Sequence, residues 1–266
     1  MKEVTQTVAR QIWSKGLLQP DEDTIVTEVP AALVYNGISH AVMMVTPTDL
    51  ENFALGFSLT EGILKRREEL LDVEIYEREH GIEIALTIGA GPFAALKGRR
   101  RTLVGRSGCG ICGVESLQQA IPGVARVSSD VRLLHRALQS AAVALDQLQS
   151  LKRLTGGVHA AAWCNAQGAI ELVREDVGRH NALDKLLGAL QITNHSAAGF
   201  ALVTSRASYE MVAKAAACNI AVLAAVSAPT SLAVQQAQSS GLTLVGFVRP
   251  GRHVIYTHPQ RMVEEI

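Results

Sequence analysis

Two cysteines stand close together in a glycine-rich segment, residues 105–113, which reads GRSGCGICG. They are Cys109 and Cys112. Four glycines in this short run favour a tightly turning or mobile loop. At this spacing both sulfur atoms can reach one transferred sulfur atom or one metal ion. The segment could therefore carry sulfur-transfer chemistry, redox chemistry or a metal.

The chain around these cysteines is basic. No Asp or Glu occurs between Glu83 and Glu115. Nearby cations lower the pKa of a thiol because they stabilise the thiolate, and a short helix predicted over residues 114–120 would add its N-terminal dipole. We therefore expect a nucleophilic thiolate. The bases of this stretch are Lys97, Arg99, Arg100, Arg101 and Arg106.

The cysteine pair has two other interpretations, a structural zinc site and a redox-active dithiol. A structural zinc site needs four ligands, and the remaining cysteines, Cys164 and Cys218, stand alone in apolar segments where a thiol packs as a small hydrophobe. We therefore expect no metal. A thioredoxin-like dithiol is the stronger alternative, although that motif belongs to a βαβ context, whereas glycine and arginine flank this one.

Three polar segments each follow a predicted apolar strand and begin a predicted helix: residues 174–185, 204–210 and 227–231. Solvated turns and helix caps are the default explanation. In an α/β sheet, however, such helix ends converge where ligands bind, and their free N–H groups hold phosphates. Arginines in these segments would add charge, and several of four residues at one-turn spacing could face one ligand. The arginines are Arg174, Arg179 and Arg206, and the residues at one-turn spacing are His180, Asn181, Asp184 and Lys185.

A fifth segment, residues 247–252, places two arginines around a Pro-Gly turn. A plain hairpin turn would explain it, but two guanidinium groups on one tight turn suit a pyrophosphate.

The elements that must position these residues divide near residue 128. Residues 1–128 form an α+β domain, and residues 129–266 an α/β domain with a largely parallel, buried sheet. In the first domain we expect two hairpins: strands 24–35 and 38–45 around Asn36-Gly37, and strands 71–77 and 82–88. Between them we expect a helix from Pro47 to about Leu64, capped by Thr46 or Thr48. A loop over 89–113 follows the second hairpin. The second domain is predicted to have a helix over 131–148, strands near 158–164, 169–174, 199–204, 220–226, 242–247 and 253–257, and helices over 180–190, 206–217 and 229–239.

Composition limits the partners. Of 266 residues, 48% are hydrophobic, which excludes a disordered chain, and only 4% are aromatic, which argues against stacking on nucleic acid. The formal net charge of zero combines 15 acids and 7 bases in residues 1–83 with 10 acids and 18 bases in residues 84–266. The basic part suits an anionic ligand, and the acidic part could form a protein-docking face. The first residues do not predict a secretory signal, and the longest apolar stretch, residues 215–226, is shorter than the roughly 20 residues of a membrane helix. We expect a cytoplasmic protein that binds neither membrane nor nucleic acid.

The order of elements in the second domain is similar to that of zinc nucleoside deaminases. Their signature is H-x-E followed by P-C-x-x-C. Here His180-Asn181-Ala182 lacks the glutamate, and no P-C-x-x-C occurs. Deamination is therefore excluded, and the layout would serve as a scaffold for a nucleotide-like ligand.

Six segments together resemble the FdhD family of formate dehydrogenase accessory sulfurtransferases, over about residues 20–260. They are SGCGICGVESL, TGGVHAAA, VREDVGRHNALDKLLG, TSRASYEMVAKAA, SAPTSLAV and GFVRPGR. The resemblance implies a sulfur carrier with a cytidine-deaminase-like second domain. It would accept persulfide sulfur from a cysteine desulfurase and pass it to the molybdenum cofactor, in its bis(molybdopterin guanine dinucleotide) form, for formate dehydrogenase.

The resemblance also implies roles for residues. Cys109 matches the persulfide cysteine and Cys112 the second cysteine, which stabilises or relays the sulfur. A homodimer that binds guanine nucleotides such as GDP or GTP is expected. A dithiol oxidoreductase and a non-catalytic cofactor-binding chaperone stay open as alternatives. The expected cofactor-binding residues are Phe247, Val248, Arg249, Pro250, Gly251 and Arg252, which match the family's cofactor segment, with Arg174, Asp176, His180 and Arg206.

Overall fold

The computed structural model of the chain describes residues 2–103 and 123–264. Cys109, Cys112 and the helix predicted over 114–120 lie outside the described residues. Among the described residues, none of the helices combines the length and apolar composition that crossing a membrane requires.

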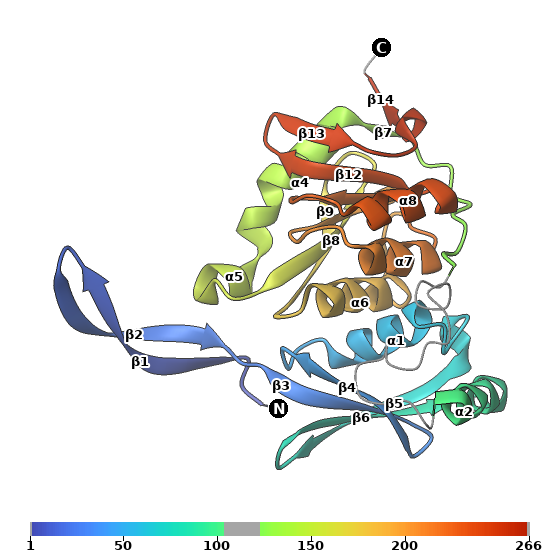
Figure 1. The fold of residues 1–266 in the computed structure, drawn as a ribbon, viewed down its shortest axis with the longest axis horizontal. Coiled ribbons are helices and arrows are strands. Elements are labelled where there is room, and N and C mark those ends of the chain that lie inside the picture. The colour runs from blue at the N-terminus through green and yellow to red at the C-terminus, as the bar shows by residue number, and fades with distance from the viewer. Residues whose placement is uncertain (1, 104–122, 265–266) are drawn as a thin grey trace.

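The chain starts with a two-stranded antiparallel ribbon that the sequence analysis does not predict. It consists of β1 (Thr5–Ser14) and β2 (Leu17–Val26), joined by a turn at Lys15-Gly16 with positive φ at both residues. The ribbon projects away from the rest of the molecule (Figure 1). Its strands are exposed along most of their length, so no alternation of apolar and polar residues marks them.

A four-stranded sheet of order β4-β3-β6-β5 follows, and it confirms both predicted hairpins. The first strand is shorter than predicted, because residues 24–26 belong to β2. Its strands are β3 (Val29–Tyr35), β4 (Ile38–Val45), β5 (Leu70–Arg78) and β6 (Gly81–Ile88). Asn36 and Gly37 have φ of 45° and 80°, as a type I′ turn requires. A short 3-10 helix, η1 (Arg67–Glu69), precedes β5.

Two helices of this half differ from their predictions. α1 (Leu50–Thr60) begins later than Pro47, with Asp49 at its N-cap, because Thr46 is buried and bonded to the other half of the chain. α2 (Ala90–Leu103) occupies most of the segment predicted as the loop 89–113. Pro92 suits its first turn, and Phe93 and Leu96 pack against the core of the four-stranded sheet.

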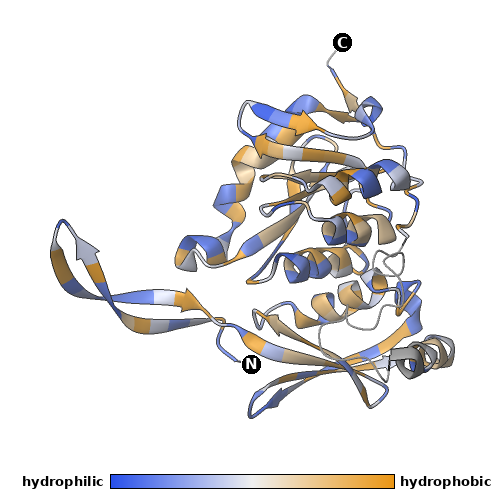
Figure 2. Cartoon of the chain, in the orientation of Figure 1, coloured by the Kyte–Doolittle hydropathy of each residue, from blue (hydrophilic) through white to orange (hydrophobic). Residues whose placement is uncertain are grey.

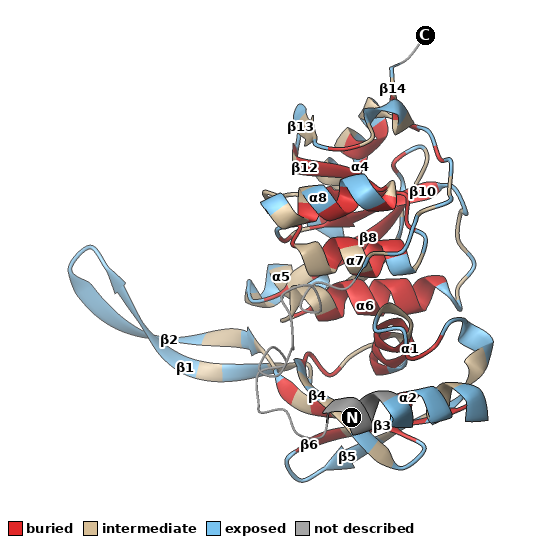
Figure 3. Cartoon of the chain, turned by 45° about the vertical axis from the view of Figure 1, so that its right-hand side comes forward, coloured by how far each residue is buried: buried red, intermediate tan, exposed pale blue. Residues whose placement is uncertain are grey.

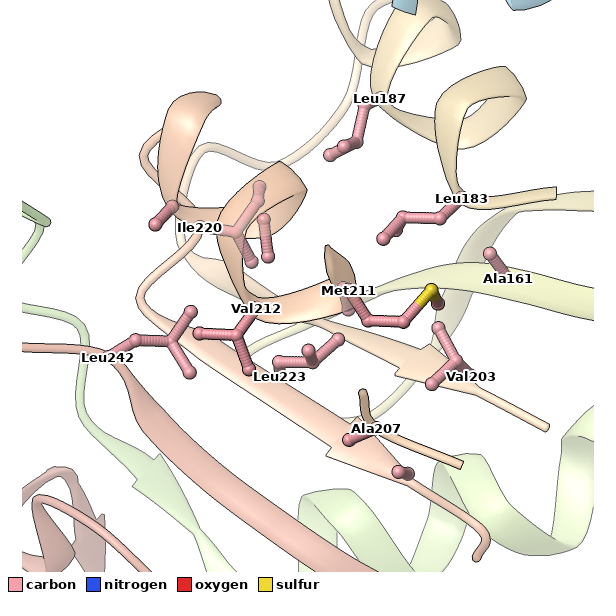
Figure 4. Close-up of a cluster of buried hydrophobic side chains, with 14 of the residues drawn as sticks. Ala161, Leu183, Leu187, Val203, Ala207, Met211, Val212, Ile220, Leu223 and Leu242 are labelled. Carbon is pink, nitrogen blue, oxygen red and sulfur yellow. The ribbon is translucent and has the colours of Figure 1, made fainter. Parts of the chain in front are cut away.

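The second half is built on a six-stranded sheet of order β13-β12-β11-β10-β8-β9. Helices α6 (Arg179–Leu190), α7 (Tyr209–Ala217) and α8 (Ser231–Ser240) pack on one face around the core that Figure 4 draws. The other face packs against α4 (His135–Leu148), which α5 (Ser150–Thr155) follows. The strands are rich in hydrophobic residues, whereas the helices carry both kinds (Figure 2). The strands are β8 (His159–Asn165), β9 (Ile170–Asp176), β10 (Gly199–Val203), β11 (Val222–Ala225), β12 (Thr243–Arg249) and β13 (Arg252–Ile255).

The prediction of a largely parallel sheet is wrong. Only the β10–β11 and β11–β12 pairs are parallel, and the other three pairs are antiparallel. The connections β8–β9 and β12–β13 are tight turns, and a parallel pair needs a longer crossover. A parallel pair of two-residue strands, β7 (Leu133–Leu134) and β14 (Met262–Val263), lies beside this sheet, and η2 (Pro259–Arg261) precedes β14.

The two halves pack together through α1 and α6. α6 is buried along almost its entire length (Figure 3) because the sheet and α7 cover one side and α1 the other. The hydrophobic core of residues 29–96 is separate from those of the six-stranded sheet. The domain division at residue 128 stays a prediction.

Candidate functional site

Most of the predicted ligand-binding segments meet at one edge of the six-stranded sheet. Strands β9, β10, β11 and β12 run in the same direction, so their carboxyl ends share this edge. Backbone bonds hold the segments together: Thr230 N donates to Ala207 O at 3.0 Å, and Phe247 N donates to Ser227 O at 3.2 Å. We call this region the carboxyl edge, formed by residues 176–180, 204–208, 227–231 and 247–252.

Two exposed guanidinium groups lie at the β12–β13 connection. Arg249 and Arg252 are directly paired across the two strands, and Pro250-Gly251 joins them. Gly251 has a φ of 80°, which fits the third position of a type II turn after proline. We call residues 249–252 the arginine turn. Directly paired residues of antiparallel strands share one face, so the turn presents two positive charges together, which suits a pyrophosphate.

The two preceding residues differ from the turn in exposure. Val248 is 1% exposed and packs into the core beneath α4, so its side chain supports the turn from inside. Phe247 is half-buried and has a positive φ of 51°, two residues before Arg249, where the register between β12 and β13 shifts.

Further cations lie along the carboxyl edge. Arg206 is exposed just before α7 and has no side-chain hydrogen bond or ion pair with the described residues. Arg179 is half-buried at the start of α6, and its Nε has no hydrogen-bond partner in the described part of the chain. Burial, and secondarily the charge of Arg179, lowers the pKa of His159, at the adjacent end of β8. The edge therefore presents positive charge and three helix N-termini, a combination that favours anions.

His180 faces a cleft of about 360 Å³ between α1 and the α6–α7 pair. Its Nε2 lies 3.8 Å from Glu210 Oε2 and has no hydrogen-bond partner among the described residues. Burial, followed by the charge of Arg179, lowers its pKa. The imidazole is therefore neutral at neutral pH and able to accept or donate one hydrogen bond. Phe57, Glu61, Tyr209 and Lys214 also line the cleft.

Asp176 and Arg174 make their contacts inside the protein. The Asp176 carboxylate is fully buried and accepts from Lys185 Nζ at 2.7 Å and from Thr46 N at 3.0 Å. Arg174 Nε lies 3.4 Å from Asp49 Oδ1. Both residues thus join β9 to the segment before α1. That Arg174 and Asp176 bind the cofactor directly stays a prediction. Their bonds inside the protein do not favour it.

Of the residues at the start of α6 expected to face one ligand, His180 and Asp184 line the same cleft, whereas Asn181 and Lys185 are not among its lining residues. Asn181, Asp184 and Lys185 are almost completely buried. Asp184 accepts from Lys214 Nζ at 2.9 Å and from Thr60 Oγ1 at 2.8 Å, and burial raises its pKa. Amphipathic spacing shows which residues share a face, but not whether another helix covers that face.

Several residues that support the site were missed because no local pattern marks them. Gln139 on α4 accepts from Gly251 N at 2.6 Å and contacts His253, which stacks against His135.

No group of three or more His, Cys, Asp or Glu side chains among residues 2–103 and 123–264 is arranged to hold a metal ion.

Comparison with known proteins decides the family. A family model described as the FdhD/NarQ family matches residues 26–263. The chain belongs to the FdhD/NarQ family. A sulfur carrier protein FdhD of Cupriavidus necator is 56% identical over 260 residues, which cover 97% of this chain and 90% of the relative. The protein of the same name from Variovorax paradoxus is 53% identical, over 91% of this chain and 87% of the relative.

A solved structure has the same fold. The crystal structure of a candidate formate dehydrogenase accessory protein from Desulfotalea psychrophila has a TM-score of 0.76 at 26% identity, over 98% of this chain and 100% of that chain. Within the chain, the FdhD/NarQ match includes Cys109, Cys112 and the arginine turn, and it begins at the last residue of β2.

Proposed function

We propose that this chain is a sulfur carrier that takes persulfide sulfur from a cysteine desulfurase and passes it to the molybdenum cofactor needed by formate dehydrogenase. The cofactor, in its bis(molybdopterin guanine dinucleotide) form, is the acceptor substrate. The observation that carries the proposal is the arginine turn on the carboxyl edge of a chain that belongs to the FdhD/NarQ family.

Loading of sulfur follows from thiolate chemistry. The Cys109 thiolate attacks the outer sulfur of the donor's persulfide. A new S–S bond forms on Cys109, the donor's S–S bond breaks, and the donor cysteine leaves as a thiolate. No net oxidation or reduction occurs.

Release of that sulfur as sulfide consumes two electrons. Attack of the Cys112 thiolate on Cys109 Sγ supplies them: a Cys109–Cys112 disulfide forms and the terminal sulfur leaves towards the acceptor. A cellular dithiol then reduces the disulfide. We expect this exchange in the cytoplasm, where reduced thiols persist.

The acceptor carries guanosines linked through pyrophosphates, and the carboxyl edge fits such a ligand. Arg249, Arg252 and Arg206 are exposed there, and guanidinium groups bind phosphate oxygens in pairs. The segments that lead into α7 and α8 lie next to each other, since Ala207 and Pro229 are bridged. GDP or GTP would bind as a partial analogue of the acceptor.

We also propose a homodimer and a docking face for protein partners. A homodimer would present two carboxyl edges to the two guanosine groups of one cofactor. The acidic residues of the first 83 positions would form the face that docks the desulfurase or the dehydrogenase.

The test is complementation of a strain that lacks this protein, using wild-type chain and Cys109→Ala, with formate dehydrogenase activity as the readout. We expect Cys109→Ala to abolish activity. Full activity of this variant would instead support a non-catalytic cofactor-binding chaperone.

Intact-mass spectrometry provides the second readout. After incubation with an active desulfurase and cysteine, the wild-type chain should gain the mass of sulfur on Cys109. Absence of this adduct, together with catalytic reduction of a disulfide substrate, would identify a dithiol oxidoreductase.

A further inference from the structure

We infer that Gln139, His253 and His135 form a latch that holds the arginine turn in its binding conformation only while the His253 imidazole is neutral. The inference rests on the proposed function of the turn as a pyrophosphate site. It assigns positioning roles to three residues that do not belong to the turn.

The contacts connect the turn to α4. Gly251 N donates to Gln139 Oε1 at 2.6 Å. The other atom of the same amide, Gln139 Nε2, lies 2.8 Å from His253 Nδ1. His253 Nε2 in turn lies 2.9 Å from His135 Nδ1.

The direction of each hydrogen bond follows from the first one. Because Gly251 N–H can only donate, Gln139 presents its oxygen to it and therefore its NH₂ group to His253. His253 Nδ1 must then be an acceptor without a proton. The single proton of the His253 ring lies on Nε2 and is donated to His135 Nδ1, which must also be unprotonated.

A proton added to His253 breaks this arrangement. Protonated Nδ1 would point an N–H group at the NH₂ group of Gln139, so two donors would face each other. Rotation of the amide would relieve that conflict, but it would bring NH₂ against the Gly251 N–H group. Without rotation the bond between Gln139 and His253 is lost, so the amide of Gln139 is no longer held in place. With rotation the bond between Gly251 N and Gln139, which connects the turn to α4, is lost.

The surroundings favour the neutral form. Burial, followed by the charge of His135, lowers the pKa of His253. The charged residues nearest to the latch along its three elements are cations: Arg249 ends β12, Arg252 precedes His253 on β13, and Arg136 follows His135 on α4. The contacts of the latch are therefore intact above the ordinary histidine pKa of about 6.5, and they are lost as the pH falls through the lowered pKa of His253.

The pH dependence of ligand binding that the latch predicts is opposite to the one that charge alone would give. A protonated histidine beside two arginines should attract a polyanion more strongly. The latch predicts weaker binding at acidic pH, because the turn is no longer held. The sign of the pH dependence therefore separates the two explanations.

The binding test uses the full chain and di(guanosine-5′) pyrophosphate, whose diester phosphates do not titrate in the range used. Calorimetry at about pH 8 and at a pH below the midpoint of the His253 ring, which NMR locates, compares wild-type protein with Gln139→Leu and Gln139→Glu. We expect wild-type affinity to fall about fivefold at the lower pH, and Gln139→Leu to lose about fivefold at the higher pH, corresponding to one lost hydrogen bond.

Gln139→Glu is the conservative variant. Its carboxylate accepts from Gly251 N–H and from protonated His253 alike, so its affinity should not fall on acidification. Tighter binding by the wild type at the lower pH, or identical pH dependence in all three proteins, would overturn the latch.

A second measurement needs no ligand. In the free wild-type protein, the NMR amide resonance of Gly251 should shift with the same midpoint as the His253 ring, and this shift should be absent in Gln139→Leu. A Gly251 resonance that ignores the titration of His253 overturns the latch. Failure of the wild-type protein to bind the dinucleotide at about pH 8 counts instead against the proposed function of the turn.

Discussion

Gly56 on α1 and Gly188 on α6 lie against each other at the crossing of the two helices, and neither position has room for a side chain. A Cβ atom on Gly188 would lie 2.8 Å from Gly56 N, and one on Gly56 would lie 2.9 Å from Gly188 N. Each would also overlap a backbone carbonyl of the opposite helix, at Asn52 and Asp184 respectively. This backbone-to-backbone contact brings the two halves of the chain close enough for the buried polar contacts around α6.

Replacement of Gly188 by alanine should therefore destabilise the protein. The new methyl group meets backbone, which cannot move aside as a flexible side chain could, so we expect a loss of about 2–3 kcal/mol in the free energy of unfolding. Urea denaturation measures it. The control is Gly98→Ala on α2, where a Cβ meets nothing within 4 Å and helix propensity should raise stability by up to about 1 kcal/mol. Equal stability of both variants would contradict the close crossing.

The buried pair of Lys185 and Asp176 gives a second stability prediction. Lys185→Met leaves the Asp176 carboxylate buried without its cation, and breaking such a pair costs about 3–5 kcal/mol. The matched control is Lys152→Met. Lys152 lies 3.2 Å from Asp146 on the surface, where an ion pair contributes at most about 1 kcal/mol. Thermal or urea unfolding that shows similar losses for the two variants would argue against the structural role of Lys185.

Thiol reactivity should distinguish the two pairs of cysteines. Burial raises the pKa of Cys218 to about 12 and raises that of Cys164 well above its ordinary value. Neither thiol should react with Ellman's reagent at about pH 8 in the native state. We expect a Cys109→Ser/Cys112→Ser variant to be unreactive until denaturant is added, whereas Cys164→Ala should keep the fast reaction. Rapid labelling of the double variant would show that a buried thiol is accessible.

The arginine turn should matter for binding but not for sulfur loading. Arg249→Ala or Arg252→Ala removes a charge-assisted bond to phosphate, so affinity for GDP should fall about tenfold. Persulfide formation on Cys109 should be unchanged by intact mass. Arg153→Ala, at an exposed position on α5, serves as the control for a general change in charge. Unchanged affinity of both turn variants would place the nucleotide elsewhere.

Much of the local structure could be predicted from sequence because neighbouring residues determine it. Asn36-Gly37 specifies a hairpin turn, and Pro250-Gly251 specifies another. The positions of β8 to β13 and of α6 to α8 follow from short apolar runs and helical spacing. The candidate chemistry was visible in the same way, since the cysteine pair and the two arginines are close in the chain.

Which residues meet across the molecule could not be predicted in this way. Thr46 contacts Asp176 across 130 positions, and Gln139 contacts His253 across 114. The antiparallel placement of β8 between β10 and β9, and the burial of Asn181, Asp184 and Lys185 under α1, also appear only in the folded chain. Periodicity reports which side chains share a face. Whether that face meets water, a ligand or another helix depends on packing between distant segments, and here that packing turned polar residues expected to bind a ligand into the contacts that join the two halves.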